Sequence, residues 1–332
     1  MHQRVTIADV AREARVSLMT VSRVINGKDG ISEATRQRVQ EVIDRLGYRP
    51  SKIARGLATQ RTGTLGLVVP DNSNPFFSEV ARGVEHAAYA EDYNVFLCNT
   101  EEDIVREHAV LESLAEKRVD GLILCSPRLD DEDLLVAIKD FPATVLINRV
   151  LPGSPAAALR IDNQEGAKAG VQHLLRRGHR AIGLLAGPLK SFGGQKRALG
   201  YRDALEEAGI PYNPNWVQHC TPMVDTGHEA AVELLTRCPE LTALFCFNDL
   251  IAIGALKACA QLGRAVPDDV AIVGFDDIPL ASLVTPPLTT FHAPRYELGR
   301  KAAEQLLAQI NGEANHTDTV IPVELVIRAS AP

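Results

Sequence analysis

The chain opens with three short segments in which apolar residues recur every three or four positions, the spacing of helices that bury one face. The first helix is expected over residues 7–14, where Thr6 and Asp9 predict a capping box at its start. The second is expected to follow a Ser17 cap and the third a Ser32 cap. Two short helices joined by a tight turn, with a third across them, predict a helix-turn-helix head. A small helical bundle with no role in DNA binding has the same periodicity and is the alternative.

Beyond residue 62, short apolar runs alternate with helical patterns. Buried strands are expected at residues 64–70, 95–98, 121–125 and 144–147, and again at 181–185, 243–247 and 270–275. Continuous apolar strands that alternate with helices predict parallel sheets covered by helices on both faces. Two such sets predict an α/β body of two lobes. The last apolar stretch, residues 320–327, indicates that the chain crosses back between the lobes near its end.

Charge is distributed unevenly between these two parts. Residues 1–62 hold twelve Lys and Arg against six Asp and Glu, whereas the remaining residues hold 23 basic and 36 acidic side chains. A basic head on an acidic body favours a polyanionic partner for the head alone. A solvated basic face would give the same count, so charge leaves both interpretations open.

The rest of the composition narrows the class of protein. The six cysteines are scattered without a C-x-x-C pair, which is typical of thiols in a reducing compartment. The first residues lack the pattern of a signal peptide, and no apolar run reaches the ~20 residues that span a membrane. A cytoplasmic protein without a membrane partner is therefore expected. The nine histidines lack metal-ligand spacing, so no metal site is expected.

Four segments of the head and of the residues after it carry a family resemblance. They read IADVA at residues 7–11, VSLMTVSRVING at 16–27, LGYRP at 46–50 and ARGLA at 54–58. These segments resemble the DNA-binding head and hinge of the LacI/GalR family of bacterial transcription regulators, and the resemblance continues to about Arg328.

The resemblance implies a domain plan and a mode of action. A helix-turn-helix domain would occupy residues 1–48, a hinge helix 49–60, and an effector-binding and dimerisation domain 61–332. The body would be periplasmic-binding-protein-like, with lobe 1 at about 61–161 plus 293–322 and lobe 2 at about 162–292 plus 323–332. A homodimer would read a near-palindromic double-stranded operator, and a small effector between the lobes, a sugar by this interpretation, would control it.

The resemblance also implies which residues meet DNA. They are Thr6, Ser17, Leu18, Met19, Thr20, Ser22, Arg23, Asn26, Arg55 and Leu57. Arg23 can make a bidentate contact to guanine, whereas Leu18 and Met19 can only pack on thymine methyl groups or exclude other bases. Leu57 would wedge into a minor-groove base step, and an ordinary linker leucine is the alternative.

Two positions depart from the family pattern. Arg15 stands in the turn where the family usually has Gly, and a left-handed conformation there would cost on the order of 1 kcal/mol. Ser51 stands where the family usually has Asn, and it can still cap a hinge helix.

Polar residues directly follow the predicted strands of the body, where parallel sheets bind ligands. They are Asp71 and Asn72, Ser126, Asn148 and Arg149, Asn248 and Asp249, and Asp276 and Asp277. With the family resemblance, the candidate effector residues are Phe76, Phe77, Ser126, Asn148, Arg149, Arg197, Asn248 and Asp276. Carboxylate, amide and guanidinium groups beside aromatic rings suit a small polyhydroxylated ligand such as a sugar.

Several of these residues have an equally simple structural role. Asp276 could serve its own loop, Asn248 could cap the helix that follows it, and Arg149 could pair with a surface acid. Phe76 and Phe77 could belong to the core. The sequence leaves these alternatives open.

An enzyme is the rival class, for example a helix-turn-helix head fused to a sugar kinase. The sequence contains no G-x-x-x-x-G-K-[ST] phosphate loop and no G-x-S-x-G elbow. No catalytic residue and no cofactor are therefore expected. The favoured interpretation is a transcription regulator, a repressor by its resemblance, whose DNA binding responds to a sugar-like effector.

Overall fold

The computed structural model describes residues 5–25, 27, 29–48, 61–313 and 318–332. The chain divides into two compact units, a head of residues 1–62 and a body of residues 63–332. The predicted Asn26, Arg55 and Leu57 contacts and the Ser51 cap lie outside the described residues, as does the whole of the predicted hinge, residues 49–60.

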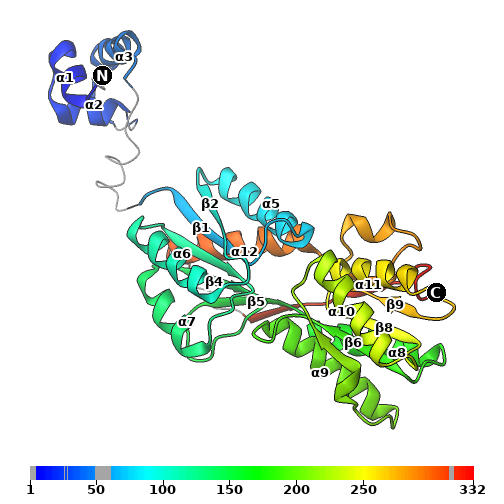
Figure 1. Cartoon of the computed structure of the whole chain (residues 1–332). Coiled ribbons are helices and arrows are strands. Elements are labelled where there is room, and N and C mark those ends of the chain that lie inside the picture. Colours follow the sequence, from blue (N-terminus) through cyan, green and yellow to red (C-terminus); the bar gives the residue numbers. More distant parts are fainter. Residues whose placement is uncertain (1–4, 26, 28, 49–60, 314–317) are drawn as a thin grey trace. The chain divides into compact units, whose positions relative to one another are not determined.

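The described part of the head contains three helices, α1 (Ile7–Ala14), α2 (Leu18–Ile25) and α3 (Glu33–Leu46) (Figure 1). The predicted capping box of α1 is confirmed, because the Asp9 carboxylate accepts a hydrogen bond from the Thr6 backbone N–H at 2.9 Å and the Thr6 hydroxyl accepts one from the Asp9 backbone N–H. Ser32 caps α3 as predicted. The three helices enclose one small core, formed by Val10, Ala11, Ala14, Val21, Val24, Val39, Val42 and Ile43.

The turn between α1 and α2 is made by a left-handed arginine. Arg15 has φ 52° and ψ 48°, and its backbone N–H donates to the carbonyls of Ala11 and Arg12. An L-residue with a side chain is strained there by about 1 kcal/mol relative to glycine. Arginine in place of the family's usual glycine therefore keeps the geometry of the turn and adds local backbone strain.

The first lobe of the body is built on a six-stranded parallel sheet with the order β11-β5-β4-β3-β1-β2. Its strands are β1 (Thr64–Val69), β2 (Asn94–Asn99), β3 (Gly121–Cys125), β4 (Thr144–Ile147), β5 (Ala157–Ile161) and β11 (Asp318–Ile321). One face packs against α5 (Pro75–Ala90) and α12 (Arg295–Ile310), and the other against α6 (Ile104–Glu116) and α7 (Asp131–Ala137), followed by the short turn η1 (Ile138–Asp140).

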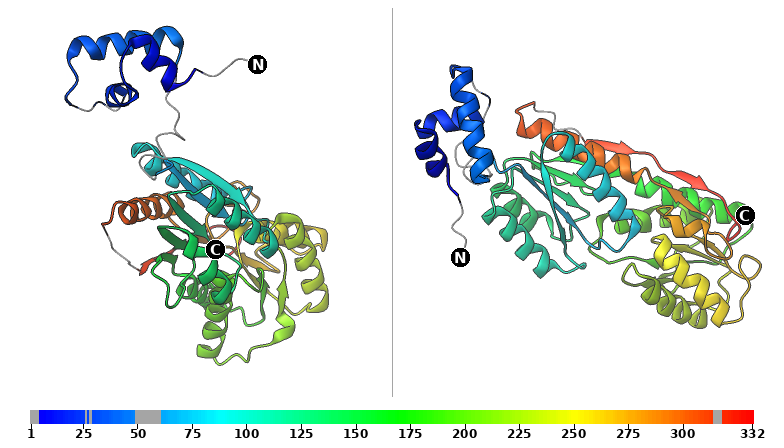
Figure 2. Two further views of the ribbon diagram at one scale, coloured as in Figure 1. Left: turned by 90° about the vertical axis from the view of Figure 1, so that its left-hand side faces the viewer. Right: turned by 90° about the horizontal axis from the view of Figure 1, so that it is seen from above.

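Glycines let α5 and α12 lie side by side (Figure 2, cyan and orange). A Cβ at Gly83 would lie 2.1 Å from the Tyr296 carbonyl oxygen, and one at Gly299 would lie 2.0 Å from the Val80 carbonyl oxygen. Because real Cβ atoms do not approach backbone that closely, only glycine permits this crossing.

The second lobe has a four-stranded parallel sheet with the order β7-β6-β8-β9. Its strands are β6 (Ile182–Ala186), β7 (Val217–His219), β8 (Ala243–Cys246) and β9 (Ala271–Val273). The helices are α8 (Asn163–Arg176) and α9 (Phe192–Glu207) on one face, and α10 (Val224–Arg237) and α11 (Asp249–Gln261) on the other, with short turns η2 (Pro214–Trp216) and η3 (Pro279–Ser282).

The chain passes between the lobes more than once, as the sequence predicted for its end. β11 belongs to the first-lobe sheet, and β12 (Glu324–Val326) then pairs antiparallel with β10 (Thr290–His292). The apolar stretch at 320–327 therefore holds the end of β11 and the whole of β12, with a break where the chain changes partner. The core is continuous across these connections, since residues of both sheets join one apolar cluster.

Two predictions about strands were incomplete or wrong. The run 95–98 was expected to be buried, but Phe96 and Leu97 of β2 are 44 % and 42 % exposed. The reason is that, among the described strands, β2 is the terminal one of its sheet and pairs only with β1. The sequence also missed β5, β7 and β10, because these strands have only three to five residues and β5 begins with alanines, which are weak strand formers.

Within the described residues, no helix combines the length and the apolar character needed to cross a membrane.

Candidate functional site

A buried ion pair lies between helix α9 and the loop after β9. The Arg197 Nη2 donates to Asp276 Oδ1 at 3.3 Å, and both side chains are 7 % exposed. The same guanidinium donates through Nε to Asn163 Oδ1 at 2.8 Å and through Nη1 to the Phe247 carbonyl. Its central carbon lies 3.7 Å from the centre of the Phe275 ring. Arg197 is thus fixed by groups from several different segments of the second lobe.

Burial shifts the protonation equilibria of this pair. It raises the pKa of Asp276 to about 6, and the positive charges of Arg197 and Arg295 oppose the rise. Burial likewise lowers the pKa of Arg197, with the Asp276 charge opposing. The carboxylate is therefore charged at neutral pH and can be protonated under mildly acidic conditions.

A hollow of about 100 Å³ lies next to this pair and is walled by both lobes. The first lobe contributes Asn148, Arg160 and Ile161, and the second contributes residues that include Asn163 and Phe192. Asn148 has a left-handed φ of 55°, and its Oδ1 accepts from the Ile161 backbone N–H at 3.0 Å. The hollow is lined mainly by amide and cationic groups, with one aromatic ring among them.

Arg149, next to Asn148, bridges the two lobes. It donates to Asp131 Oδ1 at 2.8 Å and to the Leu129 carbonyl at 3.2 Å, while its guanidinium lies 5.5 Å from the centre of the Phe192 ring. Its Nε is buried and has no hydrogen-bond partner among the described residues. The pairing of Arg149 with a surface acid, here Asp131, therefore accounts for one of its contacts. It leaves the Nε donor without a partner among the described residues.

The other sequence-predicted effector residues have structural contacts of their own. Asn248 caps α11, since its Oδ1 accepts from the Ile251 backbone N–H at 3.0 Å. Ser126 has a left-handed φ of 52°, and its N–H donates to the Ile147 carbonyl. Phe76 and Phe77 are both buried in the core, edge to face with ring centres 5.1 Å apart, and neither lines the interlobe hollow.

Among the eight described residues that line the hollow, Asn148 is the only candidate effector residue, and the other seven were not predicted. Asn163, Phe192 and Lys196 line the hollow, and Asn163 also holds Arg197. Asp249 is fully buried and supports the loop that carries Asp276, accepting from Thr290 Oγ1 at 2.5 Å and from the Ile278 N–H at 2.8 Å. Burial raises the pKa of Asp249 well above its ordinary value. Asn163 follows β5, so the rule of polar residues after strands would have found it had that strand been recognised.

The second helix of the head presents both apolar and polar groups to solvent. Leu18 and Met19, on its first turn, are 53 % and 70 % exposed, and Arg23 is exposed one turn later. The Ser17 hydroxyl accepts from the Thr20 backbone N–H at 3.1 Å and contacts the Thr20 hydroxyl at 2.9 Å. Ser22 is half-buried, and Thr6 is engaged in the capping box. Two large apolar side chains are therefore exposed at adjacent positions on the first turn of α2.

Two family models together match nearly the whole chain. Residues 6–51 match the bacterial regulatory proteins of the lacI family, and residues 62–329 match the periplasmic binding proteins and sugar binding domain of the LacI family. Among curated relatives, an HTH-type transcriptional repressor PurR of Photobacterium profundum is 40% identical over 98% of each chain. Catabolite control protein A of Priestia megaterium is 36% identical over 98% of this chain and 99% of its own.

Solved structures agree with the family models. A complex of the transcriptional regulator CelR with cellobiose is 35% identical, with a TM-score of 0.74 over 98% of this chain and 100% of its own. A lac repressor dimer bound to operator and the anti-inducer ONPF is 28% identical, with a TM-score of 0.88 over 99% of each chain. The predicted fold class, a helix-turn-helix head followed by a two-lobed body of parallel sheets, is confirmed. The matched family consists of transcriptional regulators and not of enzymes. The chain therefore belongs to the LacI family of bacterial transcriptional regulators, as a repressor with an effector-binding body.

Proposed function

We propose that this repressor binds a near-palindromic operator as a homodimer in the cytoplasm, and that a small polyhydroxylated effector, a sugar or sugar-like molecule, controls this binding from the hollow between the lobes. The observation that carries the proposal is the buried Arg197–Asp276 pair beside a hollow walled by both lobes. A ligand held there touches both lobes, so its binding energy depends on how the lobes are arranged.

The head supports the DNA part of this proposal. Arg23 supplies the two-pronged donor that distinguishes guanine in the major groove. Leu18 and Met19 offer apolar contact to thymine methyl groups. Ser17 and Thr20 lie at the start of α2, where side-chain and backbone donors suit phosphate oxygens.

The homodimer has two lines of support. The lac repressor, which this chain resembles along its whole length, is a dimer on its operator. In this chain the terminal strand β2 exposes Phe96 and Leu97, which suit an interface better than water. A two-fold dimer presents two heads and therefore reads two half-sites of opposite direction.

The chemistry of the hollow supports a neutral, hydroxyl-rich effector. Of the groups that line the hollow, the Lys196 ammonium and the Asn163 amide can donate hydrogen bonds to hydroxyl groups. The Asp276 carboxylate and the buried Arg149 Nε lie beside this lining, and the proposal is that the effector extends to both. Phe192 offers a ring face to the C–H side of a sugar. The CelR structure contains cellobiose, which supports a sugar as the ligand class.

The test uses the full-length protein in two steps. Selection from random duplex DNA is expected to enrich a near-palindromic sequence, and failure to enrich any sequence would contradict operator binding. Thermal unfolding is then measured against neutral sugars, sugar acids, sugar phosphates and purine bases. A ligand present at about 100 times its Kd stabilises the fold by ~2.7 kcal/mol. A neutral sugar is the expected hit, and a hit confined to purine bases or anions would overturn the sugar assignment.

A further inference from the structure

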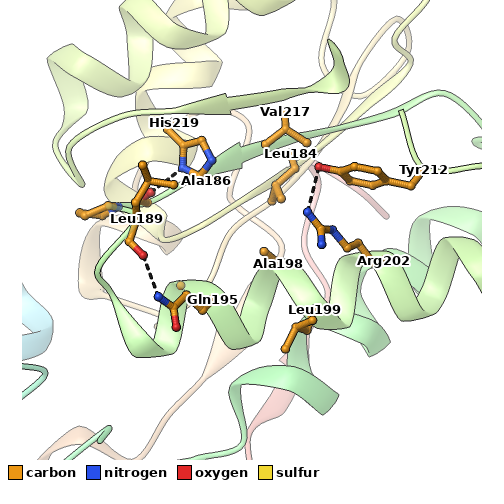
Figure 3. Close-up of a pocket in the computed structure, with 13 residues that line it drawn as sticks. Leu184, Ala186, Leu189, Gln195, Ala198, Leu199, Arg202, Tyr212, Val217 and His219 are labelled. Carbon is orange, nitrogen blue, oxygen red and sulfur yellow. Dashed lines mark hydrogen bonds between the residues drawn. The ribbon is translucent and has the colours of Figure 1, made fainter. Parts of the chain in front are cut away.

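The second lobe holds a groove that is separate from the interlobe hollow. It has a volume of about 310 Å³ and lies between helix α9 and the strands β6 and β7 (Figure 3). Leu184, Val217 and Ala198 form its apolar floor. None of its lining residues lines the hollow that contains Asn163, so the two sites are distinct. The volume falls at the lower end of the ~300–1,000 Å³ range typical of small-molecule sites.

Large apolar side chains surround this groove and face solvent. Leu189 is 71 % exposed, and Leu199 and Tyr212 are each 39 % exposed. Single exposed apolar residues are ordinary on protein surfaces. Three of them gathered around one concave apolar floor favour a site that an apolar ligand covers.

One end of the groove holds a fixed positive charge. The Arg202 guanidinium lies over the Tyr212 ring, 4.4 Å from its centre, and its Nη2 donates to the Tyr212 hydroxyl at 3.2 Å (Figure 3). Within the described part of the chain, no carboxylate lies within 4 Å of this guanidinium. Arg202 is therefore oriented by the ring while most of its N–H donors are left for an anion.

At the other end of the groove, two polar side chains contact backbone carbonyl oxygens. Gln195 Nε2 donates to the Leu189 carbonyl at 2.9 Å, and the His219 Nδ1 lies 2.9 Å from the Gly187 carbonyl oxygen. The first bond holds the loop before α9 against the helix, and the second holds the same loop against the end of β7 (Figure 3). Gln195 and Arg202 are seven residues apart on α9, so the groove between them is about 10 Å long at 1.5 Å per residue.

We propose that this groove is a second ligand site, which takes a small amphipathic carboxylate. The apolar part of the ligand lies on Leu184, Val217 and Ala198, and the carboxylate accepts hydrogen bonds from Arg202. This site does not depend on the proposed effector of the interlobe hollow. α9 nevertheless joins the two, because it carries Arg197 to the buried ion pair and Arg202 to the groove.

Equilibrium dialysis of the full-length protein tests this site with octanoate, octan-1-ol and octylammonium. These three probes have chains with the same number of carbon atoms and differ in the charge of the head group. The extended chain of octanoate is similar in length to the groove. Saturable binding in the order octanoate, octanol, octylammonium is expected. Arg202→Leu should lower the octanoate affinity at least tenfold and leave the octanol affinity unchanged. Arg176→Leu, which removes an exposed arginine at the end of α8, is the matched control and should change neither.

A second variant tests the apolar floor. Ala198→Phe places a ring over the floor and should remove the binding of octanoate and octanol alike, with the thermal unfolding temperature measured in parallel. Equal affinity of the wild-type protein for octanoate and octylammonium would overturn the proposal. So would an octanoate affinity that survives both Arg202→Leu and Ala198→Phe, since the ligand would then bind elsewhere.

Discussion

The guanidinium of Arg149 in the first lobe lies 5.5 Å from the centre of the Phe192 ring in the second lobe. Arg149 follows β4, and Phe192 is the first residue of α9, so this contact spans the interlobe site. A partly desolvated cation over a ring face is attracted by about 0.5–2 kcal/mol. The two lobes are therefore in direct contact beside the hollow, and Phe192, which lines the hollow, is one side of this contact.

A double-mutant cycle on this pair should show coupling between the lobes. We expect Arg149→Met and Phe192→Leu to destabilise the body singly and to be less than additive together, with a coupling energy of ~0.5–1 kcal/mol. The cycle cancels the loss of the Arg149–Asp131 bond, which both Arg149 variants share. Free energies of unfolding from urea titrations measure the effect, and strict additivity would contradict the contact.

Effector affinity should fall as the pH drops through about 6. The pKa of Asp276 lies near that value, so the carboxylate becomes protonated there and loses an acceptor for ligand hydroxyl groups. Titration calorimetry across pH 5 to 8 (about the range in which this group titrates) measures the step. Asp276→Asn keeps the shape without the charge, and it should bind weakly at every pH and show no step near 6.

The same carboxyl group acts on folding with the opposite sign. Its pKa in the folded chain lies above the ordinary 3.8, because burial disfavours the charged form. Its contribution to stability is therefore present below pH 3.8 and is lost as the pH rises to about 6. The free energy of unfolding of Asp276→Asn, compared with the wild type, should not show this loss over the same interval.

Arg23→Ala should weaken operator binding by ~1–3 kcal/mol and relax the preference for one base position in each half-site. The reason is that a guanidinium reads a guanine edge through two hydrogen bonds, the contact proposed for Arg23, while phosphate contacts carry no base preference. Arg38→Ala, which removes an exposed arginine of α3, is the control and should leave the base preference intact. Binding to single-base variants of the operator measures this, and an unchanged preference in Arg23→Ala would refute the contact.

Arg15→Gly should stabilise the head by up to ~1 kcal/mol, because glycine adopts the left-handed turn without strain. A β-branched residue should have the reverse effect, so Arg15→Ile is expected to destabilise the head by a similar amount. Hydrogen exchange of the α1 and α2 amides in the full-length chain reports the head alone. Faster exchange in Arg15→Gly than in the wild type would contradict this account.

Local signals in the sequence predicted much of the fold. The Thr6–Asp9 capping box and the Ser32 cap depend on residues three positions apart, so the sequence contains the whole interaction. The buried strands of both lobes are continuous apolar runs, which identify parallel sheets without tertiary information. By contrast, β2 has the same apolar run but lies at the sheet edge, and strand order is a tertiary property.

Apart from residues that the family resemblance supplied, such as Arg197, the candidate site was predicted where a recognised strand preceded it. Asp276 follows β9, an apolar strand that the sequence revealed, and Asn148 follows β4. Asn163 was missed together with β5, although it accepts the hydrogen bond that orients Arg197. The partner of Arg197 could not be read from spacing, because Arg197 and Asp276 are far apart in the chain and meet only after the second lobe has folded.

Operator affinity with and without the effector tests the central claim most directly. Fluorescence anisotropy of a labelled operator would be measured for the full-length wild type and for Arg197→Gln, with Arg176→Gln as the control. We predict that the ligand identified by thermal unfolding shifts the operator Kd of the wild type and of Arg176→Gln, while Arg197→Gln binds operator and ignores the ligand. An equal shift in Arg197→Gln would show that the effector does not act through the interlobe site.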